Sequence, residues 1–182
     1  MSRLRVALVA LVALVVCLPS CSSDPVKSHL IESLGGETPG VPKGPLHRAG
    51  QPCVACHQES GPADTVFSLA GTVYEDAMNT KPLPDARIHF IDASGKTYDT
   101  GANCTGNFFV MDADYHPAWP VWTSVIFGVA DGQPVEVPME SPIYREGSCA
   151  MCHADDQDPT QHVVHVYFAP SPLPVPPPND CP

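Results

Sequence analysis

Two short stretches of the sequence repeat one pattern, in which two cysteines separated by two residues are followed directly by a histidine. The pattern occurs at residues 53–57 (CVACH) and at residues 149–153 (CAMCH). Thiols at this spacing can add across the two vinyl groups on one edge of a haem, and the next residue can turn its imidazole onto the iron. We therefore expect two covalently attached haems c, with His57 and His153 as the proximal iron ligands. The sulfurs of the thioether bonds would be those of Cys53, Cys56, Cys149 and Cys152.

Three other uses of paired cysteines explain less of this pattern. Zinc knuckles use cysteine pairs at this spacing, but zinc leaves the histidine after each pair without a reason. A thioredoxin-like redox pair requires a strand–helix–strand context, which neither stretch has. A structural disulfide across two residues is strained, although an oxidising compartment would favour disulfides in general. Haem accounts for all three residues of the pattern in both copies.

The N-terminus has the features of an export signal. Residues 1–20 contain two arginines and then an apolar run at 6–18, which is too short to cross a bilayer. Residues 18–21 (LPSC) resemble the lipobox of bacterial lipoproteins, and this resemblance implies cleavage before Cys21 and acylation of its thiol. Ser22 rather than Asp follows, which by the same resemblance favours the outer membrane. We expect a lipid-anchored protein of the Gram-negative cell envelope, facing the periplasm or the exterior; an ordinary signal cleaved nearby is the alternative.

Two further cysteines, Cys104 and Cys181, belong to neither motif. In an exported protein two free thiols are less common than one disulfide. We therefore expect a disulfide between them, which would hold the Pro-rich C-terminal tail against the rest of the chain.

The charge of the chain restricts its partners. Twenty acidic residues face nine basic ones, and the formal net charge is −11. Such a surface repels the phosphates of nucleic acids and attracts basic partners. We expect no nucleic acid among the partners, and instead other redox proteins, such as cytochromes with basic docking faces. The acidic cluster at residues 155–158 is either a solvated loop or a docking patch beside the second motif.

The segment between the motifs has the pattern of short β-strands. Its apolar stretches are rich in β-branched and aromatic residues and alternate with turns that contain Gly, Pro, Asp and Asn. This pattern predicts a mainly β fold, an antiparallel β-sandwich with little helix, flanked by the two haem-binding loop segments. The strands are expected at 66–74, 87–91, 96–98, 107–111, 121–129, 134–137 and 163–168.

Within this segment, three stretches resemble carboxypeptidase-regulatory-like domains, which are transthyretin-like β-sandwiches. The stretches are residues 71–74 (GTVY), 82–90 (PLPDARIHF) and 105–109 (TGNFF), and the resemblance covers roughly residues 68–130. The fold it implies hosts many functions, so it indicates none by itself. The whole arrangement is similar to small lipoprotein cytochromes, in which one such haem segment precedes the sandwich and a second follows it.

The expected layout has six parts. They are a signal peptide (1–20), a flexible tether (21–51), a first haem segment (52–65), the β-sandwich (66–138), a second haem segment with a closing strand (139–168) and a Pro-rich tail (169–182).

The sixth ligand of each iron decides between electron transfer and chemistry on a bound molecule. Met139 resembles the Met that precedes the second haem segment in the related cytochromes, and it is the first candidate. His165 follows the second motif in a segment with strand alternation and is the second candidate. Further candidates are His47, His116 and His162. Each of these residues also fits an ordinary loop or surface position.

Three functions are consistent with these features. The first is a membrane-anchored dihaem cytochrome c that carries electrons between redox partners of the envelope. The second is a haem enzyme with an open iron, such as a peroxidase or reductase, for which His116 with Asp112 or Asp114 would supply acid–base groups. The third is a surface recognition β-sandwich that the haems stabilise. Because no linked catalytic set is evident, we expect an electron-transfer protein rather than an enzyme.

Overall fold

The structure is a computed structural model that describes residues 24–37, 39–75, 81–153, 166–167 and 181. The chain divides into two compact units, Met1–Gly35 and Gly36–Pro182. The predicted signal peptide and the lipidation site at Cys21 lie outside the described residues. In the described part of the chain, no helix is long and apolar enough to span a bilayer.

In the described part of the N-terminal unit the chain forms the helix α2 at Pro25–Ser33. Its N-cap is Asp24, whose carboxylate accepts hydrogen bonds from the amides of Val26 (2.9 Å) and Lys27 (3.3 Å). The proline at the first helical position has no amide hydrogen to leave unpaired. This stretch of the expected tether (21–51) is therefore helical, because the Asp–Pro cap stabilises a helix despite its weak apolar periodicity.

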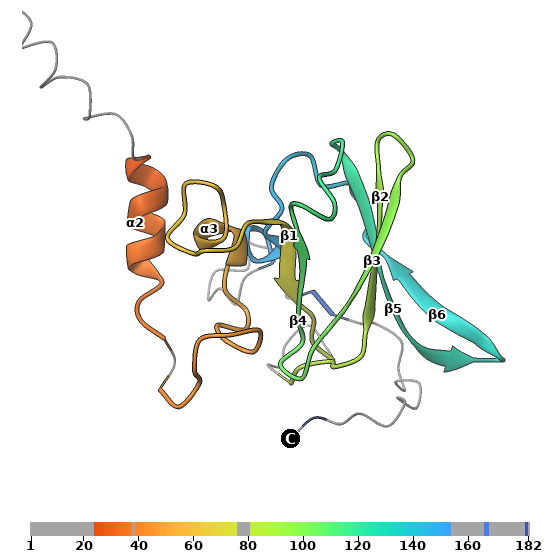
Figure 1. The fold of residues 1–182 in the computed structure, drawn as a ribbon. Helices are drawn as coiled ribbons and strands as arrows, with labels where there is room; N and C mark the ends of the chain where they lie inside the picture. Colours follow the sequence, from red (N-terminus) through yellow and green to blue (C-terminus); the bar gives the residue numbers. More distant parts are fainter. Residues whose placement is uncertain (1–23, 38, 76–80, 154–165, 168–180, 182) are drawn as a thin grey trace, which may run out of the picture. The chain divides into compact units, whose positions relative to one another are not determined.

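The second unit is mainly β, as predicted, with two antiparallel sheets (Figure 1). One sheet pairs β1 with β4, and the other has the order β3-β2-β5-β6. Its only helical pieces within the described residues are the short turns α3 (Cys53–Cys56) and η1 (Cys149–Met151). The strands are β1 (Phe67–Thr72), β2 (Arg87–Asp92), β3 (Thr97–Gly101), β4 (Asn107–Met111), β5 (Val121–Ala130) and β6 (Gln133–Pro138).

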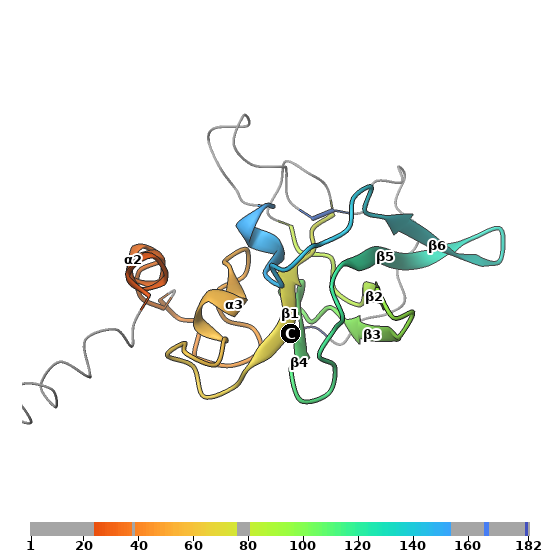
Figure 2. The same ribbon diagram turned by 90° about the horizontal axis from the view of Figure 1, so that it is seen from above.

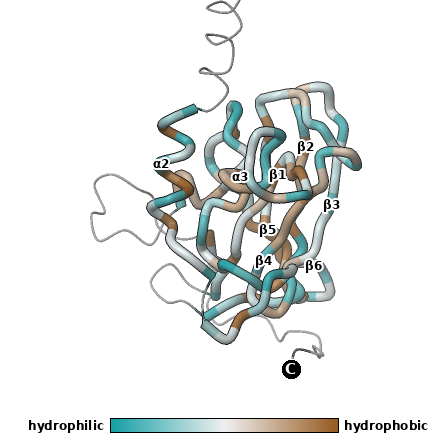
Figure 3. The backbone as a smooth tube through the Cα atoms, turned by 60° about the vertical axis from the view of Figure 1, so that its left-hand side comes forward, coloured by the Kyte–Doolittle hydropathy of each residue, from teal (hydrophilic) through white to brown (hydrophobic). Residues whose placement is uncertain are grey.

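The two sheets enclose one hydrophobic core, as in a sandwich. Alternation along β2 turns Ile88 and Phe90 inward, where they meet Phe108 and Val110 of β4. Leu69 of β1 is fully buried in the same cluster. Figure 3 shows that the hydrophobic stretches of the backbone gather along these packed strands, whereas the connecting loops are mostly hydrophilic. Burial of these side chains supplies the main driving force for this fold.

The six described strands agree with the predicted positions to within a few residues. The largest difference is in β3, which continues to Gly101 because its whole length pairs with β2, from Arg87 opposite Gly101 to Ile91 opposite Thr97. The predicted strand at 163–168 lies mostly outside the described residues. Of its two described residues, Tyr167 forms a parallel bridge with Tyr74.

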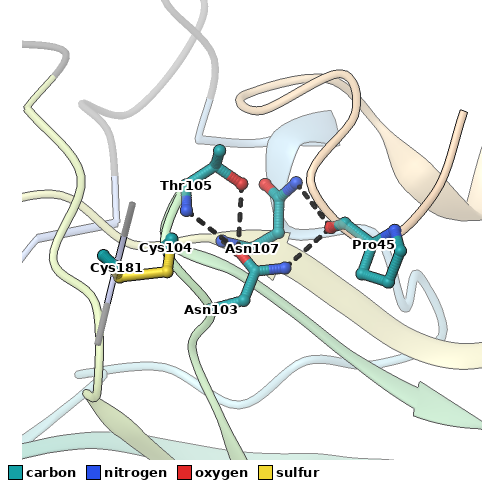
Figure 4. Close-up of a disulfide and its surroundings, with 6 residues drawn as sticks. All are labelled: Pro45, Asn103, Cys104, Thr105, Asn107 and Cys181. Carbon is teal, nitrogen blue, oxygen red and sulfur yellow. Dashed lines mark hydrogen bonds between the residues drawn. A yellow bond between two sulfur atoms is a disulfide. The ribbon is translucent and has the colours of Figure 1, made fainter. Parts of the chain in front are cut away.

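The expected disulfide between Cys104 and Cys181 is present in the structure (Figure 4). Cys104 lies in the turn between β3 and β4, and the bond spans 77 positions of the sequence. Beside it, the Asn103 carboxamide oxygen accepts hydrogen bonds from the Thr105 amide (3.0 Å) and hydroxyl (2.9 Å), which fix the turn.

Candidate functional site

The two cysteine–histidine motifs share two backbone hydrogen bonds, although the first is an α-helical turn and the second a 3-10 turn. In both, the histidine amide donates to the carbonyl of the first cysteine, at 2.9 Å from His57 to Cys53 and at 2.8 Å from His153 to Cys149. A second hydrogen bond, from the third motif residue to the residue before the motif, measures 3.0 Å in each copy. Each motif is thus one closed helical turn, and such a turn brings residues three positions apart to the same side. The paired thiols therefore lie on one side of each turn.

Strand β1 positions both motifs. It follows the first motif directly, and the Phe67 amide donates to His57 O at 2.8 Å. On the second motif's side, the Ala70 amide donates to Gly147 O at 2.8 Å, and Ser148 forms a parallel bridge with Ala70. In both ribbon views α3 and η1 lie close to β1 (Figures 1 and 2). The central strand of the site is therefore β1.

Gly71 of β1 allows the second motif to come close. A Cβ atom built at this position would lie 2.8 Å from Cys149 Cβ and 3.1 Å from its sulfur. It would also lie 2.8 Å from Phe108 Cζ in the core. Because real Cβ atoms essentially never approach this closely, any side chain here would push η1 or Phe108 away.

All four motif cysteines are free thiols in the structure. Burial raises the pKa of the Cys53 thiol to about 11. Burial also raises the pKa of Cys149 to about 12, and negative charge at Cys53 raises it further. The first cysteines of the two motifs are thus close enough to interact electrostatically. Cysteines that act as nucleophiles have lowered pKa values, so these two thiols have the opposite character.

The His57 ring is oriented by the residues around it. Its Nδ1 lies 3.0 Å from Thr65 O and 2.9 Å from Thr65 Oγ1, and the ring stacks on Phe67 with the centroids 4.1 Å apart. With the ring proton on Nδ1 as donor to the Thr65 carbonyl, Nε2 keeps its lone pair for a metal. Burial lowers the pKa of His57, the hydrogen bond to Thr65 opposes this, and positive charge on His47 lowers it further. The neutral ring that an iron ligand requires is therefore favoured.

A second histidine lies close to this ring. The centroid of His47 is 6.0 Å from that of His57, and the two ring planes meet at 71°. The loop that carries His47 belongs to the expected tether, but it is hydrogen-bonded to the sandwich. The Gly50 amide donates to Thr72 Oγ1 at 2.8 Å, and the Asn107 side-chain amide donates to His47 O at 2.9 Å.

The other predicted ligands are placed differently or lie outside the described residues. His116 is exposed, and its Nδ1 lies 2.7 Å from Asp112 Oδ1. Met139 follows β6, and its amide donates to Thr123 O of β5 at 2.9 Å. His162 and His165 lie outside the described residues, so the sixth ligand of the second motif stays a prediction.

Several residues that shape the site carry no signal in the sequence. Thr65 acts through its backbone carbonyl, which any residue has, and Gly71 is one of 13 glycines. Asn107 sits where a strand begins, so its buried amide looks like an ordinary turn residue. Only contacts between distant segments show what these residues do.

Comparison with known proteins gives no relative: no family model, no curated protein and no solved structure matches this chain. Within the described residues, no three His, Cys, Asp or Glu side chains gather as the ligands of one metal ion.

Proposed function

We propose that this protein is a dihaem c-type cytochrome that carries electrons between redox partners of a bacterial envelope. One observation carries the proposal: both motifs form a helical turn closed by the same two backbone hydrogen bonds, and both turns lie against β1. Chance repetition of a five-residue pattern does not explain why the two copies also share these hydrogen bonds and a supporting strand.

The residues present fit two attached haems. Each turn offers two free thiols and a following histidine, and the Thr65 carbonyl orients His57 so that Nε2 can bind a metal. Haem iron would supply one-electron transfer between its ferric and ferrous states. The first attachment cysteines, Cys53 and Cys149, lie within electrostatic reach of each other. Attachment points this close support electron exchange within one chain.

The anchor and the partners belong to the same proposal. The resemblance to small lipoprotein cytochromes places Cys21 at a lipid anchor, and the net charge of −11 favours basic redox proteins as donors or acceptors. The mainly β fold is consistent with the transthyretin-like sandwich of that resemblance. Haem attachment at both flanks would add apolar surface to a core of modest size.

Reaction with carbon monoxide and with redox partners tests this function against the alternatives. An electron carrier with both irons six-coordinate should bind carbon monoxide slowly after reduction. It should also exchange electrons with a small basic cytochrome at a rate that falls as ionic strength rises. Rapid binding of carbon monoxide at both haems would favour the haem enzyme. Exchange too slow to measure, with basic and acidic partners alike, would favour the recognition sandwich.

A further inference from the structure

The pairing of His47 with His57 has a specific geometry. Their ring centroids are 6.0 Å apart at an interplanar angle of 71°, so the rings do not stack. A metal–imidazole bond is about 2.0 Å long, so two imidazoles that bind one metal ion from opposite sides have ring centroids about 6 Å apart. The spacing of the two rings is therefore that of two axial ligands of one iron.

The remaining nitrogen of each ring points to an acceptor. His57 Nδ1 lies 3.0 Å from the Thr65 carbonyl oxygen, and His47 Nδ1 lies 3.5 Å from Glu37 Oε2. Histidines that bind metals usually donate their second N–H to a carbonyl or carboxylate, which fixes the ring and raises its basicity. The Nδ1 atom of His57 has such a partner and that of His47 faces a carboxylate at ion-pair distance, which leaves both Nε2 atoms for a metal.

The Glu37 and His47 side chains are partly buried, and the two atoms that face each other form no hydrogen bond. In the described part of the chain, neither Glu37 Oε2 nor His47 Nδ1 has a hydrogen-bond partner, although both atoms are shielded from solvent. Arg48 Nε lies 3.4 Å from the same carboxylate oxygen. Shielding these two polar atoms from solvent without a hydrogen bond has a free-energy cost that a loop with only a surface role would avoid. A metal bound at Nε2 would explain the pair, because the ring proton of His47 would then be on Nδ1, next to the Glu37 carboxylate.

The His47 loop is held in place by buried hydrogen bonds. The Asn107 side chain donates to His47 O at 2.9 Å and to Pro45 O at 3.3 Å, and its oxygen accepts from the Thr72 hydroxyl at 2.7 Å. Asn103 donates to the same Pro45 carbonyl at 2.7 Å (Figure 4). These bonds join the loop to β1, the strand that follows the first motif, and to its partner strand β4. His47 and His57 are therefore fixed on one framework.

We propose that His47 is the sixth ligand of the first haem iron, which then has two histidine ligands, with Glu37 as the residue that orients His47. This inference rests on the proposed function. It assigns the first haem a ligand set that excludes small molecules from its iron. It also leaves Met139 and the histidines after residue 153 as candidates for the second haem only, so the two haems can differ in potential.

The experiment uses the mature protein made with a haem c maturation system, together with His47→Ala and two control variants. His29→Ala and His116→Ala each remove an exposed histidine, at α2 and after β4. The readouts are the haem content, the spin state of the ferric protein by electron paramagnetic resonance, and the number of carbon monoxide molecules bound after reduction.

His47→Ala should keep both haems but convert one of the two from low spin to high spin. It should gain one rapidly bound carbon monoxide per chain, and added imidazole should restore the low-spin signal. The controls should match the wild type. Glu37→Gln should keep low-spin iron but raise the reduction potential of the first haem above that of the wild type. The reason is that an amide polarises His47 more weakly than a carboxylate does, so the ferric state is less stabilised.

Two outcomes would overturn the assignment of His47 but not the proposed function. One is a His47→Ala variant that carries two haems with an unchanged spin state; the other is a change of spin state that added imidazole does not reverse. If His47→Ala fails to fold, near-infrared magnetic circular dichroism of the wild type decides, because it distinguishes two histidine ligands from histidine with methionine. If the spectrum shows that neither haem of the wild type has two histidine ligands, the assignment is wrong. A wild-type protein without haem would instead show that the proposed function itself is wrong.

Discussion

Burial keeps the thiols of Cys53 and Cys149 protonated at neutral pH, with pKa values of about 11 and about 12. Cysteines with lowered pKa values serve as nucleophiles and redox pairs, so these two are unsuited to such roles. Cys152, by contrast, is exposed. The difference within one motif gives a test that needs no haem.

In haem-free protein at pH 8, Cys149 should react with iodoacetamide on the order of a hundredfold more slowly than Cys152. The raised pKa leaves only a small fraction of thiolate, and this fraction grows as the pH rises toward 11. Peptide mass spectrometry of timed samples gives both rates in one experiment, with Cys152 as the internal control. Equal rates at the two cysteines would contradict the raised pKa of Cys149.

The environment of Asp92, at the end of β2, should make the stability of the fold depend on pH. Its carboxylate accepts hydrogen bonds from Ser94 Oγ (2.6 Å), Ala118 N (3.1 Å) and Lys96 N (3.0 Å), and these hold its pKa at about 2. The pKa is about 3.9 in an unfolded chain. The stabilisation is therefore complete above about pH 4 and is lost as the pH falls through about 2.

Asp92→Asn should lower the melting temperature at pH 7 by on the order of 5 °C, because the amide presents a donor to groups that themselves donate. The difference from the wild type should shrink toward pH 2. Calorimetry across this pH range measures both effects. Asp112→Asn, which changes a partly exposed carboxylate beside His116, is the control and should have little effect. A difference in melting temperature that stays the same at all pH values would contradict this role of Asp92.

At the scale of elements, β1 links the fold to the site. Five of its six residues are buried; Leu69 lies in the core, and Gly71 lies against Cys149 of the second motif. One edge pairs with β4, and the other receives Ser148 at Ala70, with Tyr167 bridging to Tyr74 just beyond the strand. A change in β1 should therefore affect the motifs more than the sheet.

Gly71→Ala should reduce attachment at the second motif, so that a larger fraction of chains carries one haem. The added methyl group collides with Cys149 and Phe108, and overpacking of this kind costs about 1–3 kcal/mol. Gly101→Ala in β3 is the matched control, because nothing lies within 4 Å of its added Cβ. Intact-mass analysis gives the haem count of each variant. Equal counts in the two variants would refute this use of Gly71.

The sequence could predict the elements whose signal is local. Alternation and turn residues predicted the strands, and cysteine spacing picked out the two cysteine–histidine motifs, because each of these signals lies within one short stretch of the sequence. Helix α2 was missed because its stability comes from the cap at Asp24 rather than from an apolar stripe. The approach of His47 to His57 was not predicted either, since it depends on Asn107, 60 residues away from His47 in the chain.

At the scale of the whole molecule, the Cys104–Cys181 disulfide closes a loop over 77 positions. Cross-linking positions this far apart removes conformational entropy from the unfolded chain. The bond also fastens the end of a Pro-rich tail to the turn that begins β4.

Cys181→Ser should lower the free energy of unfolding by about 2–4 kcal/mol. The two haem motifs should still be filled, because the bond lies at the turn before β4 rather than at either motif. Denaturant unfolding, paired with the haem count, separates stability from attachment, and the double variant with Cys104→Ser controls for the remaining free thiol. Unchanged stability would mean that the tail is held by other contacts.

The most direct test of the account is a pyridine haemochrome spectrum combined with the intact mass of the mature protein made with a haem c maturation system. The account predicts the spectrum of haem bound by two thioethers and a mass increased by two haems per chain, with the additions on peptides that contain Cys53 and Cys149. Colourless protein with the mass of the bare polypeptide and four free motif thiols would contradict it.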